Sequence, residues 1–360
     1  MLNFINIFLT GMLLLLAADN PFGNRIDLGK IESEDLTEIS GMEAGVLNKD
    51  VFWVHNDSGN DDAVYAINRK GELVAVFELE DIELVDLEDI SIGSGPVSGK
   101  SYIYLADIGD NESERKKKYI YRFEEPELEN INVFQKGTIS EIEKFSFEYP
   151  DGKRDAETLM IDEREENLII ISKREDNVNV YISDLPDEGD KALSFKKIST
   201  LPFGNEGYVN SGVTGGDMSG DGSEILVKTY GKVYYYKRNG TLTETFSKKP
   251  IEVDYIFEPQ SEAICFGAEN EGFYTSSEIS PLQITPHLYF YPRKTSGLDE
   301  GSLNLNQKKK ELGAFTKTEL YSSEGIRVED TSLSALSSGM YFKKYTYKDS
   351  IDTKKILLIK

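Results

Sequence analysis

A unit of short strand-like runs recurs along the chain. Runs rich in Val, Ile, Tyr and Phe, such as VFWV, SYIYLAD, NLIIIS and KVYYYK, are separated by Gly, Asn and Asp, and long helical periodicity is absent. Each unit opens with an acid, and successive acids are 50, 69, 60 and 45 residues apart: Glu38, Glu88, Glu157, Asp217 and Glu262. About four strands per unit at this spacing predict an all-β fold, a β-propeller.

The number of blades follows from closing the ring. The last unit, from Glu262, supplies three strands and ends near PRKTSG. The segment RIDLGKI, residues 25–31, is expected to supply the missing outer strand, because closure by strands from both ends removes exposed sheet edges. This arrangement predicts five blades over residues 19–298, and the long second and third units leave six as the alternative.

Two acid-rich loops follow second strands of consecutive units. HNDSGNDD begins at His55 and ADIGDNES at Ala106, and both contain Asp-x-Gly. In an up-and-down blade the first strand starts at the face where the second ends, so Asp57 and Asp107 are expected beside Glu88 at one mouth of the channel. Asp, Asn and Gly are also ordinary turn residues, so turn chemistry alone remains an equal explanation.

Converging carboxylates require counter-charge, and the sequence offers two sources. One is a pair of lysines at second-strand ends, which would form a salt-bridged plug. The other is a hard cation such as calcium, which takes several oxygen ligands. The candidate cation ligands are Glu88, Glu157, Asp217, Glu262, Asp57 and Asp107. The candidate residues of the rim are Lys173, Lys228 and Glu278.

His55 is one of two histidines and the candidate catalytic residue, as a general base or an oriented hydrogen-bond donor. A structural role is the more common one for such a histidine. A Ser-centred elbow, a zinc-type His cluster and a phosphate-cradling Gly loop are all absent from the sequence, which disfavours a serine hydrolase of the usual kind. The single cysteine, Cys265, precludes an internal disulfide.

Charge is distributed unevenly along the chain. The formal net charge is −24, which repels a phosphate backbone and argues against nucleic acid as a partner. The segment from Glu300 to Lys360 has 11 basic and 8 acidic residues, so it is net +3 and the rest is −27. This shift, together with period-two alternation, predicts a separate small β-sandwich over residues 299–360.

The first residues, MLNFINIFLTGMLLLLAADN, are interpreted as a secretory signal peptide over residues 1–18. The apolar stretch is too short to span a bilayer, and small residues follow it. Because Lys and Arg are missing before it, a short membrane anchor remains the alternative. The mature chain is expected to contain no membrane span.

The tail resembles the C-terminal sorting domain of the type IX secretion system. The resemblance lies in LSALSSGMYFKKYTYKDSIDTKKILLIK, with LNLNQKKK and KTELYSSEGIRV fitting the middle strands, although the early Pro-Asn-Pro strand is not evident. It implies passage through the periplasm to the outer-membrane surface or the medium, with the secretion machinery as a partner. The residues that match the sorting signal are Gly339, Tyr341, Lys354, Lys355 and Lys360.

The body resembles secreted bacterial propellers of phytase-like and esterase-like style. The resemblance is carried by WVHNDSG, DLEDISIG, ADIGDN, RDAETLMID and VTGGDMSGDG. It implies the propeller fold, but the acidic signatures of the calcium-dependent phytases do not match residue by residue, and no catalytic residue is transferred.

Two functions therefore remain open. The first is a surface module that binds a small ligand, a protein or a glycan, with the acids in a salt-bridged plug. The second is a calcium-assisted hydrolase of a phosphate or carboxylic ester. Direct contact between the lysines and the acids would favour the plug.

Overall fold

The computed structural model describes residues 20–57, 59, 61–204, 212–279 and 285–294, and four strands of the C-terminal region. The predicted signal peptide lies outside these residues. Nearly all regular structure is β, as predicted, and the helix α1 (Leu242–Phe246) spans a single turn. No helix of the described part is long and apolar enough to cross a membrane.

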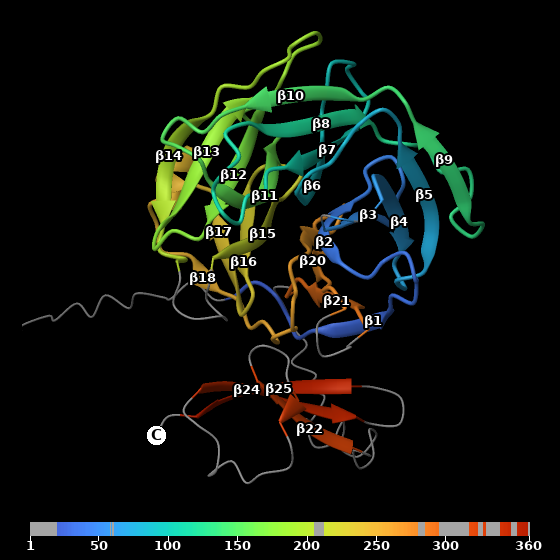
Figure 1. Ribbon diagram of the computed structural model, residues 1–360, viewed down its shortest axis with the longest axis vertical. Coiled ribbons are helices and arrows are strands. Elements are labelled where there is room, and N and C mark those ends of the chain that lie inside the picture. Colours follow the sequence, from blue (N-terminus) through green and yellow to red (C-terminus); the bar gives the residue numbers. More distant parts are fainter. Residues whose placement is uncertain are drawn as a thin grey trace, which may run out of the picture.

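Five sheets surround a central axis (Figure 1), and this confirms the five-bladed propeller. Blade 1 holds β2 (Ile39–Ala44), β3 (Val51–Asn56), β4 (Ala63–Asn68), β5 (Leu73–Leu79) and β9 (Gln135–Ile139). Blade 2 holds β6 (Leu87–Gly93), β7 (Tyr102–Asp107), β8 (Lys118–Glu124) and β10 (Glu143–Phe147). Blade 3 holds β11 (Asp155–Asp162), β12 (Asn167–Lys173), β13 (Val178–Asp184) and β14 (Lys196–Leu201). Blade 4 holds β15 (Val213–Met218), β16 (Glu224–Thr229), β17 (Lys232–Lys237) and β18 (Ile251–Glu252). Blade 5 holds β19 (Ile264–Phe266), β20 (Gly272–Thr275), β21 (His287–Pro292) and β1 (Ile26–Lys30).

The ring closes through blade 5, as the sequence predicts. The N-terminal strand β1 pairs antiparallel with β21, with Ile26 opposite Phe290 and Lys30 opposite His287. In Figure 1 the blue β1 lies beside the orange β21. Joining both ends of the propeller in one sheet protects the terminal strands from edge pairing.

Apolar side chains between neighbouring blades form the core. Five clusters of buried residues correspond to the five blade interfaces. Each interface is filled by aromatic and β-branched residues; Trp53, for example, packs between blades 1 and 2 and is fully buried. The Tyr-rich run KVYYYK contributes to the interfaces on both sides of blade 4, so its aromatic residues serve packing.

The residue that follows each third strand contacts the preceding blade. Arg69 pairs with Glu271, Arg238 with Asp162 and Arg293 with Glu224. At the same position, Glu125 accepts hydrogen bonds from blade 1, and Leu185 packs into the interface of blades 2 and 3. This repeated contact joins the blades at the face where the inner strands end.

The tail contains a four-stranded antiparallel sheet in the order β23-β22-β24-β25. Its strands are β22 (Lys317–Ser322), β23 (Arg327–Val328), β24 (Gly339–Thr346) and β25 (Ile351–Leu358). A single sheet is described here, so the small β-sandwich over 299–360 stays a prediction.

Candidate functional site

The inner strands begin at one mouth of the channel, and four of them begin irregularly. The pairing register shifts around Ser40 in β2, Glu88 in β6, Glu157 in β11 and Thr214 in β15. A bulge leaves its extra residue outside the ladder and re-aims its side chain. Glu262, two residues before β19, joins this set, because its carboxylate accepts a hydrogen bond from Ser40 Oγ at 3.1 Å.

This register corrects the expected set of five acids. The repeating position holds three glutamates, one serine and one threonine, so Ser40 replaces Glu38 and Thr214 replaces Asp217. Asp217 lies nearer the other end of β15, where its carboxylate accepts hydrogen bonds from the backbone N–H groups of Met218 (2.6 Å) and Phe266 (2.6 Å). The spacing of acids in the sequence does not show which residue lies at the bulge.

Lys173 supplies counter-charge to the three glutamates. Its ammonium group forms an ion pair with Glu157, and both side chains are buried. Although burial disfavours the charged lysine, the carboxylates of Glu157, Glu262 and Glu88 raise its pKa. Part of the acidic mouth is therefore a salt bridge, as the plug hypothesis expects.

Lys228 occupies a different environment. Its ammonium group donates to the carbonyl oxygens of Ser261 and Thr229 rather than to a carboxylate. Burial lowers its pKa to about 8, opposed by the nearby Glu258. Lys228 therefore contributes to the interface of blades 4 and 5 and adds no direct partner for the glutamates.

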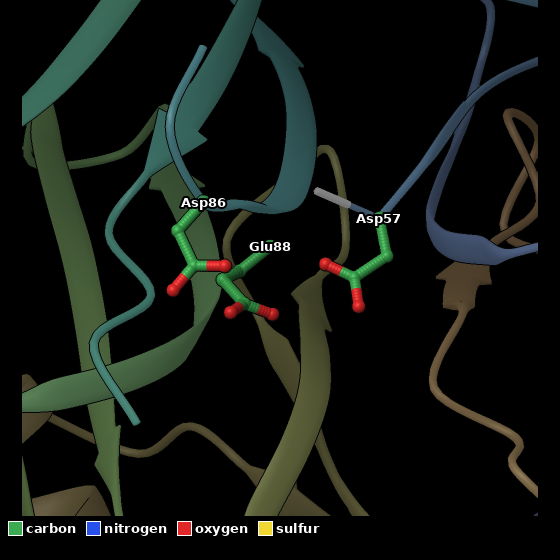
Figure 2. A group of neighbouring side chains, drawn as sticks. All are labelled: Asp57, Asp86 and Glu88. Atoms are coloured by element: carbon green, nitrogen blue, oxygen red, sulfur yellow. The ribbon is translucent and has the colours of Figure 1, made fainter. Parts of the chain in front are cut away.

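A second group of carboxylates lies beside Glu88. One oxygen each of Asp57, Asp86 and Glu88 lie within 4.8 Å of one another. Figure 2 shows the carboxyl group of Glu88 between those of Asp86 and Asp57. Glu88 and Asp86 come from the start of β6, and Asp57 follows β3 of the neighbouring blade. We call this group the carboxylate trio.

The environment of the trio disfavours an ionised Glu88. Burial raises the pKa of Glu88 well above its ordinary value, and the charges of Glu157 and Asp57 raise it further. Lys173 opposes this shift without cancelling it. Burial also raises the pKa of Glu278, at the rim, to about 9, helped by the charges of Glu262 and Asp57. Such a cluster favours protons or a bound cation.

The backbone opposite the trio is glycine. A Cβ added at Gly109 would overlap Glu88 Oε1 and Asp86 Oδ2. The glycine in ADIGDN therefore serves the close approach of its loop to the carboxylates, not a positive φ, which its backbone does not have. Gly59, in the corresponding loop of blade 1, does have a positive φ, of 84°.

The two acid-rich loops are equivalent with an offset of one residue. Asn56 lies opposite Ile39, and Asp107 lies opposite Leu87. The Asn56 side chain accepts a hydrogen bond from the Glu38 backbone N–H (3.2 Å), just as Asp107 accepts one from the Asp86 N–H (3.1 Å).

Asp107 is thus a support for the site rather than a member of the trio. It is fully buried and also accepts a hydrogen bond from Arg115 at 2.6 Å. By holding the backbone N–H of Asp86, it fixes the start of β6. Turn chemistry explains this loop, whereas the corresponding loop of blade 1 delivers Asp57 to the trio.

His55 is buried between blades 1 and 2. Its Nδ1 lies 2.8 Å from the carbonyl oxygen of Asn56, and its Nε2 has no hydrogen-bond partner among the described residues. Burial lowers its pKa to about 4, so the ring is neutral near pH 7. It lies against Gly41, and its complete burial does not suit proton exchange with a substrate.

The spacing of acids in the sequence does not single out Asp86, the third residue of the trio. Its signal was present in DLEDISIG, because Asp86 and Glu88 are two residues apart at the start of a first strand. Alternate residues of a strand share a face.

No protein-family model matches the chain, and no curated protein matches it. Among solved structures, the chain is similar to a luciferin-regenerating enzyme, with a TM-score of 0.40 and 10% sequence identity. The alignment covers 77% of this chain and 99% of that chain.

Proposed function

We propose that this protein is an exported propeller that binds a ligand at its acidic mouth through a divalent cation, with calcium as the cation. The convergence of Asp57, Asp86 and Glu88 within 4.8 Å carries the proposal. Carboxylate oxygens are the ligands that calcium takes, and coordination by three leaves positions for an incoming anionic group.

Two further observations support the fit of a cation at the trio. Gly109 leaves the space that a side chain would otherwise take from the trio. Glu157 Oε2 is buried without a hydrogen-bond partner among the described residues. Because Glu157 Oε1 is engaged by Lys173, Glu157 serves better as a neighbour of the cation than as a ligand. The candidate ligands thereby narrow to the trio.

Calcium titration into the chelator-treated chain tests the proposal. We expect binding heat and a rise in the unfolding temperature, and we expect Asp86→Asn to lose both. Glu83→Gln, an exposed neighbour in the same loop, is the matched control and should bind as the wild type does. Equal behaviour of Asp86→Asn and Glu83→Gln would exclude a cation held by the trio.

A metal-assisted hydrolase is the second candidate, and Glu157 favours it. Burial raises its pKa to about 8, so this carboxyl group is poised for proton transfer near neutral pH. A bound cation would supply charge stabilisation for an ester or phosphate oxygen. The test is turnover of p-nitrophenyl phosphate and p-nitrophenyl acetate with calcium, in the wild type and in Glu157→Gln. Calcium binding without turnover would exclude the hydrolase and leave the binding module as the remaining function.

Export by the type IX secretion system is part of the proposal. Its support is the tail sequence and the β24–β25 hairpin, in which Tyr341 lies opposite Ile356 and Phe342 opposite Lys355. Deleting residues 299–360 is expected to retain the propeller in the periplasm of a host that has this system. Delivery of the truncated chain to the cell surface would contradict this route.

A further inference from the structure

The opposite end of the channel holds a pocket with a volume of about 840 Å³. Its lining comes from the ends of all five inner strands or the loops that follow them: Leu47, Gly93, Glu163, Gly220 and Ala268. We call it the distal pocket, because the carboxylate trio lies where the inner strands begin. Its volume falls within the range of about 300–1,000 Å³ that small-molecule sites occupy.

One lip of the distal pocket is apolar and exposed. Val46 and Leu47, in the loop after β2, are 59% and 50% exposed, and Ile92 of β6 lines the same pocket. Large aliphatic side chains at a pocket entrance gain free energy when a ligand covers them, at about 25 cal/mol per Å² of buried apolar surface.

Glu125 holds this lip in place. Its buried carboxylate accepts hydrogen bonds from Leu47 N (2.8 Å), Asn48 Nδ2 (2.9 Å), Trp53 Nε1 (3.0 Å) and Ser101 Oγ (2.6 Å). These donors come from blade 1 and blade 2, so the loop that presents Val46 and Leu47 is fixed to both. The lip is preorganised, which reduces the entropy lost on binding.

The charged residues that line the pocket are mostly acidic. They comprise four glutamates and one lysine. Glu125 is satisfied internally, and Glu124 pairs with Lys100 at 2.6 Å. Glu163 Oε1 accepts a hydrogen bond from Ser94 N at 2.5 Å, and Glu127 makes no ion pair among the described residues. Glu127 and Glu163 thus keep negative charge directed at the pocket without a basic partner there.

We propose that the distal pocket is a second binding site that takes a small organic cation with an apolar body. The ammonium group would lie near Glu163 and Glu127, and the apolar body would cover Val46 and Leu47. The same carboxylates repel carboxylate and phosphate ligands. This site is independent of the cation at the trio, because it uses different residues at the other end of the channel.

Isothermal titration with hexylammonium, hexanoate and hexanol into the full chain tests the proposal. Hexylammonium is expected to bind more tightly than hexanol, which lacks the charge, and hexanoate is expected not to bind. Butylammonium, a fourth probe with a shorter apolar body, is expected to bind less tightly than hexylammonium. Glu163→Gln keeps a side-chain oxygen that accepts the hydrogen bond from Ser94 N. It is expected to weaken the binding of hexylammonium about fivefold, the upper range for a solvent-accessible charge pair. Leu47→Ser is expected to weaken it while leaving the preference for positive charge.

Glu129→Gln, an exposed neutralisation outside the pocket, is the matched control. Glu127→Gln, at an exposed position, replaces Glu163→Gln if that variant does not fold. The site is excluded if hexanoate binds as well as hexylammonium, if hexylammonium does not bind, or if all pocket variants match Glu129→Gln. Asp86→Asn should bind hexylammonium normally, so failure of the calcium proposal is distinguishable from failure of this one.

Discussion

The two ends of the channel are built by the same five inner strands and manage charge in opposite ways. Where the strands end, buried acids between the blades are matched by arginines, as in Arg238–Asp162 and Arg293–Glu224, and the glutamates there without a basic partner among the described residues line the distal pocket. Where the strands begin, the glutamates share Lys173. Acids paired across blades stabilise the ring, whereas the acids crowded at the acidic mouth are the ones that we propose to hold a cation.

The largest effect on stability is expected at the buried ion pair between Arg238 and Asp162. Arg238 donates to both oxygens of Asp162 (2.8 and 2.7 Å), and both side chains are fully buried. Arg238→Met leaves a buried carboxylate without its partner and should reduce the free energy of unfolding by about 3–5 kcal/mol. Urea denaturation measures this loss. The double variant Arg238→Met/Asp162→Leu should recover most of it, and no recovery would show that lost packing, rather than charge, is responsible.

Lys173→Met should reduce the free energy of unfolding by less, about 1–3 kcal/mol when a chelator has removed calcium. The reason is that a protonated Glu157 requires no cationic partner. The pKa of Glu157 is already raised to about 8. Calcium affinity should rise in the same variant, since a positive charge near Glu88 has been removed. Denaturation with and without calcium measures both effects, and unchanged or weaker calcium binding would break the contrast between the two ends.

A pH-dependent effect is expected from the interior of the channel, between the two ends. Burial raises the pKa of Asp217 to about 7, and Glu43, which is hydrogen-bonded to it, also has a raised pKa. The folded state therefore holds a proton that the unfolded state releases near pH 4. Stability from this pair is complete below about pH 4 and is lost as the pH rises toward 7.

Glu43→Gln donates to Asp217 at every pH and should reduce this decline. His55, whose depressed pKa of about 4 gives stability that is lost as pH falls below about 6.5, contributes equally to both proteins and cancels in the difference. Thermal unfolding across pH 4–8 measures the difference, and parallel profiles would contradict the shared proton.

The smallest effect is expected from Gly109→Ala. The added Cβ must displace the carboxylates of Glu88 and Asp86. We expect a stability loss of about 1 kcal/mol and about tenfold weaker calcium binding. Gly220→Ala is the control, because no atom lies within 4 Å of its added Cβ. Identical calcium affinity in both variants would show that the close approach of Gly109 does not shape the site.

Recurring strand signals and turn residues were enough to predict the all-β fold and the closing role of residues 25–31, and they favoured five blades over six. These features follow from local alternation and from the need to bury both faces of each blade. They also placed Glu88, Glu157 and Glu262 at one mouth, because an acid before an apolar strand marks where that strand begins.

Which acids meet depends on strand register and on packing between blades. The position of each bulge has no clear sequence signal, and it places Thr214 rather than Asp217 at the start of β15. The pairing register likewise makes Asn56, not Asp57, the counterpart of Asp107. Pairing across blades is likewise invisible in the sequence, since Arg238 and Asp162 lie 76 residues apart. The strands are specified locally, but the charges meet through long-range packing.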